Sequence, residues 1–128
     1  MKKNILYLGL ILTIIMSCTS TENDIKDITV SDLQVVLKNN KNIQLVDVRT
    51  PAEWVEGTIK TAIEINVTAN DFEKNALAKL DKTKPVYIYC RSGGRSKIAS
   101  ELLLKKGFQP YNVLGGYIAW EKEIGNEK

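Results

Sequence analysis

A single stretch decides the fold of this chain: Val86-Tyr87-Ile88-Tyr89-Cys90-Arg91-Ser92-Gly93-Gly94-Arg95. Its first four residues are β-branched or aromatic, which predicts a buried strand. A segment with helical spacing follows, and we expect that helix to begin at Ser96. Cys90 is therefore predicted between the carboxyl end of a strand and the amino end of a helix, where open α/β sheets bind their ligands.

The residues around Cys90 favour an ionised thiol. Unpaired N–H groups in the first turn of a helix attract anions, and Arg91 and Arg95 place two positive charges beside the cysteine. A thiol in such surroundings loses its proton easily. Gly93 and Gly94 allow the backbone to take positive φ and to turn its N–H groups inward as a nest. We expect an exposed, reactive thiolate inside a ring of hydrogen-bond donors.

The segments on either side of this stretch alternate between strand and helix patterns. Strands are predicted at 43–48, 62–67, 86–89 and 113–114. Helices are predicted at 51–55 and 117–124. Capping boxes at Ser31 and Asn70 predict the start of two more helices, and another is expected from Ser96 to Gly107, where glycine ends it. This alternation predicts an α/β fold, a mostly parallel sheet of four to five strands with helices on both faces.

Length and composition narrow the class of protein. The 128 residues leave room for one domain, and the formal net charge is +3. No basic block is interleaved with aromatic residues, so nucleic-acid binding has little support. The chain has no histidine and two cysteines, which excludes the usual zinc sites and any catalysis by a histidine base. Neither a metal nor another cofactor is expected.

The amino terminus is separate from the predicted domain. Lys2 and Lys3 precede a largely apolar run over residues 5–16. That run is shorter than the roughly 20 residues of a membrane-spanning helix, and it suits the apolar core of a secretory signal. The sequence that follows, Ile15-Met16-Ser17-Cys18, resembles a bacterial lipobox, in which cleavage just before the cysteine is followed by its lipidation. An uncleaved anchor and a signal cut elsewhere are the alternatives.

The lipobox implies a domain organisation and a location. We expect a lipoprotein-type signal peptide at 1–17, a tether at 18–27 with lipid on Cys18, and the folded domain at 28–128. The protein is then expected in the bacterial cell envelope, outside the cytoplasm and attached to a membrane through lipid alone. Cys90 is then the only free thiol, and an unpaired thiol kept in an oxidising compartment suggests a use for it.

Three segments of the domain carry a resemblance to a known family. They are Leu45-Val46-Asp47-Val48-Arg49 with Glu53-Trp54 and Gly57-Thr58-Ile59, then Cys90 to Ser96, then Asn112-Val113-Leu114-Gly115-Gly116 with Trp120. In this order and at these separations they resemble a single-domain rhodanese, a sulfurtransferase, over residues 29–123. The family usually has His, Pro and Gly where this chain has Thr58, Lys60 and Thr61.

The resemblance implies the reaction. Cys90 takes the outer sulfur of a donor such as thiosulfate or a persulfide, carries it as a persulfide, and passes it to cyanide or a thiol. The residues implied to bind substrate are those of the loop, Arg91, Ser92, Gly93, Gly94, Arg95 and Ser96. Asp47 and Arg49 are expected to have a supporting, structural role, as partners for Glu53 or for the loop. Arg95 is expected to shape the loop and add positive potential, and Arg91 to point outward.

Loop length bears on the reaction class. Four residues separate Cys90 from Arg95, which in this family makes a cup for a sulfane sulfur, whereas related phosphatases and arsenate reductases have five. The alternatives are a persulfide carrier without turnover, a rhodanese-like binding module and, least favoured, a phosphatase or arsenate reductase. The partners expected are the small sulfur donor, the acceptor and a thiol-reducing protein.

Overall fold

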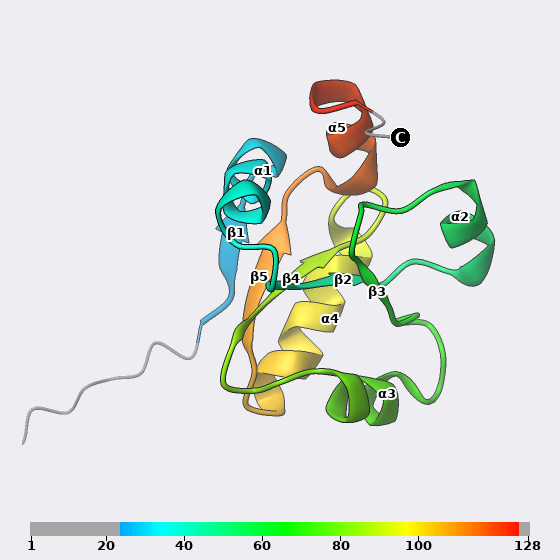
Figure 1. Ribbon diagram of the computed structural model, residues 1–128. Helices are drawn as coiled ribbons and strands as arrows, with labels where there is room; N and C mark the ends of the chain where they lie inside the picture. The colour runs from blue at the N-terminus through cyan, green and yellow to red at the C-terminus, as the bar shows by residue number, and fades with distance from the viewer. Residues whose placement is uncertain (1–23, 126–128) are drawn as a thin grey trace, which may run out of the picture.

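Five parallel strands form one sheet in the spatial order β1-β5-β4-β2-β3 (Figure 1). The computed structural model describes residues 24–125. The strands are β1 (Lys26–Ile28), β2 (Gln44–Asp47), β3 (Ile63–Glu64), β4 (Pro85–Tyr89) and β5 (Gln109–Val113). The helices are α1 (Val30–Asn39), α2 (Pro51–Glu56), α3 (Phe72–Lys79), α4 (Gly94–Lys105) and α5 (Gly116–Glu123). The predicted α/β fold with a parallel sheet is confirmed.

Each face of the sheet is covered by helices. Successive strand residues point to opposite faces, so both faces carry hydrophobic side chains that the helices bury. On one face, α3 and α4 pack over a cluster that includes Val46, Ile88 and Leu103. On the other face, α1 and α5 pack over a cluster that includes Leu45 and Tyr89. Two hydrophobic layers therefore hold β4, the strand that leads into Cys90, from both sides.

The predictions for the first helix cap and the first strand were wrong. Helix α1 is capped by Thr29, whose Oγ1 accepts the N–H of Asp32 at 3.1 Å, and the predicted cap Ser31 lies inside the helix. Strand β1 was missed because it has three residues, two of them exposed, and pairs only with β5 at the sheet edge. Such a short, polar segment carries no periodic signal.

Other boundaries also differ from the prediction. Strand β3 has two residues instead of the six predicted at 62–67, and β5 begins at Gln109 and includes Pro110, which discourages a strand assignment. Helix α3 follows Asp71, without a side-chain cap, so the predicted cap at Asn70 is wrong. Helix α4 begins two residues before Ser96.

Thr61 shows what the departure from the family pattern does locally. It has φ 71°, the left-handed conformation that glycine adopts without steric cost. A non-glycine residue held there costs on the order of 1–3 kcal/mol unless its surroundings compensate. The turn before β3 therefore keeps a glycine-type geometry although threonine occupies it.

The predicted signal peptide at 1–17 and the lipidation site Cys18 lie outside the described residues. Lys26 and Asp27, which the prediction placed in the tether, form the start of β1. Between residues 24 and 125, no helix is long and apolar enough to cross a membrane.

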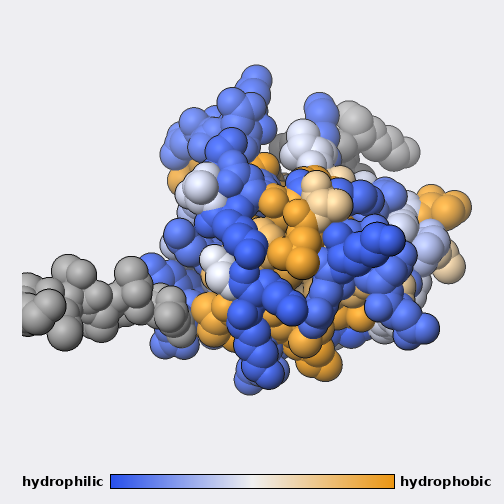
Figure 2. Space-filling model, turned by 90° about the horizontal axis from the view of Figure 1, so that it is seen from below, coloured by the Kyte–Doolittle hydropathy of each residue, from blue (hydrophilic) through white to orange (hydrophobic). Residues whose placement is uncertain are grey.

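The amino ends of the strands form one end of the molecule. Viewed from below, Figure 2 shows hydrophobic side chains gathered between hydrophilic ones. A cavity of about 360 Å³ lies beside the starts of β2 and β4, bordered by Ile43, Pro85 and Tyr87. The Cys90 loop is at the other end, where the strands finish, so this cavity does not belong to it.

Candidate active site

The carboxyl ends of the three central strands bring together residues far apart in the sequence. Asp47 at the end of β2 pairs in register with Tyr89 at the end of β4, and Ile88 pairs with Asn112 of β5. Because parallel strands end at the same edge, the Cys90 loop lies between the segments that follow β2 and β5. The sequence-predicted residues Asp47 and Cys90 therefore share one end of the sheet.

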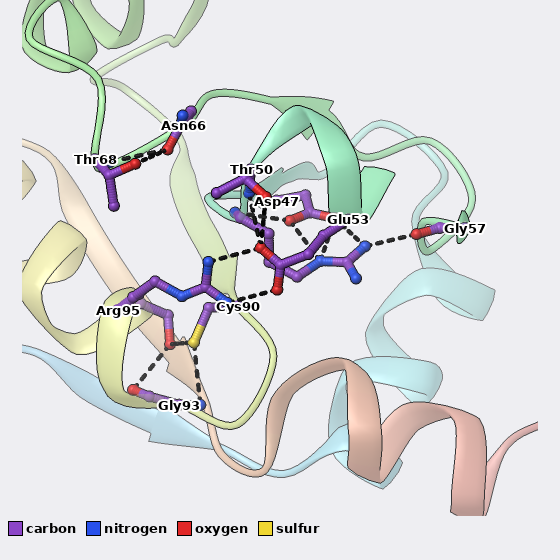
Figure 3. A network of polar contacts seen from close by, with 11 residues as sticks. Asp47, Thr50, Glu53, Gly57, Asn66, Thr68, Cys90, Gly93 and Arg95 are labelled. Carbon is purple, nitrogen blue, oxygen red and sulfur yellow. Dashed lines mark hydrogen bonds and ion pairs between the residues drawn. The ribbon is translucent and has the colours of Figure 1, made fainter. Parts of the chain in front are cut away.

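The loop after β4 curls around the sulfur of Cys90. The N–H of Gly93 donates to Cys90 Sγ at 3.1 Å, and Gly93 has φ 116°, which a side chain would disfavour. Ser96 Oγ lies 3.4 Å from the same sulfur. Figure 3 shows Gly93 and Cys90 facing each other across the loop. Of the two glycines expected to take positive φ, Gly93 does and Gly94 does not, because Gly94 is the first residue of α4.

The base of the loop is fastened to α5. The carbonyl oxygens of Cys90 and Arg91 accept the N–H groups of Tyr117 and Ile118 at 2.8 and 3.1 Å. Gly116 permits this approach, because a Cβ there would lie 2.5 Å from the Cys90 oxygen. The first turn of α5 consequently sits directly against the backbone that carries the cysteine.

Cys90 is buried, which corrects the expectation of an exposed thiol. Its relative exposure is 1%, and its neighbours include the hydrophobic cluster beneath α3 and α4. Burial opposes ionisation, but hydrogen bonds from the Ser96 hydroxyl and from the backbone N–H groups of Ser96, Gly93 and Ser92 outweigh it. They hold the pKa of Cys90 below its ordinary value, so the anionic form of this buried sulfur is stabilised relative to that of an ordinary thiol.

Arg95 is paired with a carboxylate, which offsets part of the positive potential expected of it beside Cys90. Its two terminal nitrogens donate to the two carboxylate oxygens of Glu53, both at 2.7 Å. Glu53 also accepts the N–H and hydroxyl of Thr50, as the capping box at the start of α2. Hydrogen bonds from the Arg95 guanidinium are the largest cause that lowers the pKa of Glu53. The capping hydrogen bonds from Thr50 and the Coulomb attraction of Arg95 lower it further, so this pKa lies far below its usual range. Figure 3 shows the pair beside Cys90.

Asp47 and Arg49 pair with each other, not with Glu53. The Arg49 guanidinium donates to both Asp47 oxygens at 2.8–3.1 Å and to the carbonyl of Gly57 at 2.6 Å. Both side chains are almost fully buried. The guanidinium also stacks over the Tyr117 ring, 4.2 Å from its centroid. The pair thus connects β2, the end of α2 and α5 in the wall behind the loop.

Three predicted loop residues are placed differently from the rest. Arg91 and Ser92 are exposed, as is Gly94, the first residue of α4. Ser96 is fully buried in the first turn of the same helix. Arg91 is therefore the loop cation that solvent and an anionic ligand could reach.

Two site residues escaped the sequence reasoning. Glu53 was noted only in the motif and as a partner for Asp47 and Arg49, although its carboxylate binds Arg95 to α2. Asn112 was noted only as part of a motif, although its Oδ1 accepts the Ser96 hydroxyl at 2.6 Å. Asn112 precedes the strand predicted at 113–114, so its place within a buried strand gave no signal in the sequence.

The donor set does not favour a metal. Among residues 24–125, no three histidine, cysteine, aspartate or glutamate side chains gather where they could hold an ion. The groups aimed at Cys90 Sγ are N–H and O–H donors, which suit an anion.

Comparison with known proteins agrees with this geometry. The family model described as "Rhodanese-like domain" matches residues 29–123. The chain belongs to the rhodanese-like domain family. A solved relative, described as a rhodanese-like domain protein from Staphylococcus aureus, superposes with a TM-score of 0.68 at 36% identity, covering 75% of this chain and 91% of the other.

Curated relatives carry the domain alone and within larger proteins. A protein named "Sulfurtransferase" from Allochromatium vinosum is 33% identical over 99 residues, which cover 77% of this chain and 90% of that protein. A tRNA uridine(34) hydroxylase from Pelagibacter ubique is 39% identical over 90 residues, 69% of this chain but 30% of the relative. This rhodanese-like domain therefore resembles sulfurtransferases over nearly their whole length.

Proposed function

We propose that the protein is a sulfurtransferase that carries sulfane sulfur as a persulfide on Cys90. The observation that supports this most is the set of donors directed at one sulfur atom, in a loop with four residues between Cys90 and Arg95. Donors held at hydrogen-bond distance from a developing anion stabilise it without reorganisation. The Cys90 thiolate, which attacks the donor and is regenerated by the acceptor, is such an anion.

The proposed reaction has two halves. The Cys90 thiolate attacks the outer sulfur of thiosulfate or of a persulfide, a new S–S bond forms, and sulfite or the donor thiolate leaves with the electron pair of the broken bond. An acceptor, cyanide or a thiolate, then attacks the outer sulfur of the enzyme persulfide. The Cys90 thiolate leaves and is regenerated, so the kinetics are of the ping-pong type.

We propose roles for the surrounding residues in this scheme. The backbone N–H groups of residues 92, 93 and 96 stabilise the terminal sulfur, with Gly94 leaving the loop open at the helix start. Exposed Arg91 attracts the anionic donor. Arg95 and Glu53 fix the shape of the loop, and Asp47 and Arg49 support its wall.

Thiocyanate formation tests the proposal. The protein, given thiosulfate and cyanide, should release thiocyanate over many turnovers, and a Cys90→Ser variant should release none. Ser100→Ala is a matched control, because the hydroxyl of Ser100, one turn further along α4, donates to the backbone carbonyl of Ser96 and not to the sulfur. Equal thiocyanate production by the Cys90→Ser variant would refute the mechanism.

Burial of Cys90 favours one second candidate, a persulfide carrier that turns over slowly. A sulfur with 1% exposure accepts and releases a group only when the loop opens. Under this alternative, Cys90 becomes labelled once per protein molecule by a persulfide donor, and thiocyanate production stops after one equivalent. A burst experiment with stoichiometric protein distinguishes the carrier from the enzyme.

We further propose that the domain is held at a membrane of the bacterial envelope through lipid on Cys18, with a thiol-reducing protein as a partner. The lipobox-like Ile15-Met16-Ser17-Cys18 supports the anchor. Mass spectrometry of the mature amino terminus tests it. A diacylated Cys18 at the first position is expected, and an unmodified terminus or one that begins elsewhere contradicts the proposal.

A further inference from the structure

The Ser96 hydroxyl has one proton and three acceptors within reach. Its oxygen lies 2.6 Å from Asn112 Oδ1, 3.0 Å from the Gly93 carbonyl oxygen and 3.4 Å from Cys90 Sγ. A hydroxyl donates one hydrogen bond and accepts others. The shortest contact identifies Asn112 as the acceptor of the Ser96 proton, which leaves the oxygen of Ser96 to accept from the thiol.

Asn112 is placed to influence Ser96 and nothing else at the site. It belongs to β5, is 4% exposed, and lies in register with Ile88, two residues before Cys90. Among the described residues, its side chain makes the hydrogen bond to Ser96 and no other. A buried carboxamide in a strand between hydrophobic neighbours is costly unless its polar atoms are used.

Ionisation of Cys90 reverses what Ser96 must do. While Cys90 is a thiol, its S–H donates to Ser96 Oγ, and the Ser96 proton goes to Asn112. When the sulfur is an anion, it needs a donor, so the Ser96 hydroxyl must turn from Asn112 to the sulfur. The Ser96 oxygen then needs a donor in its place. A carboxamide supplies one, because rotation by 180° exchanges its oxygen for its NH₂ group.

We propose that Asn112 is a positioning residue that aims the Ser96 hydroxyl: its oxygen accepts from Ser96 when Cys90 is a thiol, and its NH₂ donates to Ser96 when Cys90 is a thiolate or persulfide. The significance of this relay for sulfur transfer rests on the proposed function. The relay itself is a property of the thiol and can be measured without any sulfur donor.

Other charges around Cys90 are compensated in pairs. The groups that face it from the packed elements are the Arg95–Glu53 pair, the Asp47–Arg49 pair, Tyr89, Tyr117 and exposed Arg91. Each buried or half-buried cation has its own carboxylate, and the hydrogen bonds to the sulfur together outweigh the burial that opposes its ionisation.

The test is a double-mutant cycle read out by the pKa of Cys90. The rate of iodoacetamide alkylation at Cys90, followed on the full chain by peptide mass spectrometry across pH, gives this pKa for the wild type, Asn112→Ala, Ser96→Ala and the double variant. Asn112→Ala removes the donor to Ser96, so the pKa should rise by about one unit, which lowers the thiolate fraction about tenfold at pH below the pKa. In the Ser96→Ala background, the same change should leave the pKa unaltered.

Two results would overturn the relay. One is an unchanged pKa in Asn112→Ala. The other is an equal shift with and without Ser96, which would mean that Asn112 acts by packing or by some other route. Ser100→Ala, one helical turn away, should leave the pKa unchanged and serves as the control for loss of a buried hydroxyl.

An isosteric variant keeps the test valid if Asn112→Ala does not fold. Asn112→Asp retains the shape and, when ionised, accepts but cannot donate, so it should raise the pKa of Cys90 more in the presence of Ser96 than in its absence. Equal shifts in the two backgrounds would show a charge effect alone and reject the relay. If the relay holds but the wild type makes no thiocyanate, the proposed function fails while the proton arrangement stands.

Discussion

Gly116→Ala should distort the Cys90 loop more than any other single methyl addition at a described glycine. A Cβ at Gly116 would lie 2.5 Å from the Cys90 oxygen and 2.7 Å from the carbonyl carbon and oxygen of Arg91. All three atoms are backbone, so they cannot rotate away. Ordinary contacts between carbon and oxygen begin at about 3.3 Å, which requires the loop and α5 to separate by roughly 1 Å.

The expected cost follows from what that separation breaks. The hydrogen bonds from Tyr117 and Ile118 to the loop carbonyls are 2.8 and 3.1 Å long, and each is worth about 1 kcal/mol. Gly116 also has φ 55°, and alanine in that left-handed conformation costs about 1 kcal/mol more. The sum, about 3 kcal/mol, should lower the melting temperature of a domain of this size by more than about 10 °C.

Two other glycines provide matched controls in thermal unfolding followed by circular dichroism. At Gly94 a Cβ meets nothing within 4 Å and φ is not positive, so Gly94→Ala should cost nothing. At Gly125 a Cβ also meets nothing, but φ is 83°, so Gly125→Ala measures the backbone strain alone. If Gly116→Ala loses no more stability than Gly125→Ala, the loop is not fastened to α5 as described.

Three further outcomes are expected. Glu53→Gln should lower the free energy of unfolding at neutral pH by about 1 kcal/mol, because the bidentate pair with Arg95 is half-buried. Since the folded pKa of Glu53 is lowered, the pair stabilises the fold above the ordinary carboxyl pKa of about 4.3, and this stabilisation is lost as pH falls below it. In urea unfolding, the free energies of unfolding of wild type and variant should converge in acid. A difference that persists in acid contradicts the pairing. The lowered pKa of Cys90 likewise predicts that wild type gains stability over Cys90→Ala as pH rises through the folded pKa toward about 8.5, and a constant difference across that range speaks against a stabilised thiolate. Arg91→Ala should raise KM for thiosulfate with kcat and melting temperature unchanged, because Arg91 is exposed; an unaltered KM removes Arg91 from donor binding.

The strand, loop and helix around Cys90 were predictable because the signal is local. An apolar β-branched run, a glycine pair and a helical pattern lie within 20 consecutive residues, and the structure builds β4, the loop and α4 from them. The alternation of such units also determines a parallel sheet, since strand, helix and strand connect in one direction. The secondary structure of each of these segments could therefore be predicted from its own sequence.

The contacts between segments could not be predicted from the sequence. The Glu53–Arg95 pair joins residues 42 positions apart, and it depends on where α2 lies against the loop. Burial of Cys90 depends on the hydrophobic cluster beneath α3 and α4, and its carbonyl meets the first turn of α5 in a contact between residues 90 and 117. The charges of Arg95 and the glycines of the loop suggested an open, positive cup, and only the packed structure shows that the cation is neutralised and the sulfur covered.

The most direct test of the central claim is the intact mass of the protein after exposure to sulfur donors. Incubation with thiosulfate or a small persulfide should add the mass of one sulfur atom, localised to Cys90, and an acceptor thiol should remove it. The Cys90→Ser variant should gain nothing. A wild-type mass that stays unchanged with every donor, or an equal gain in Cys90→Ser, would contradict a persulfide on this cysteine.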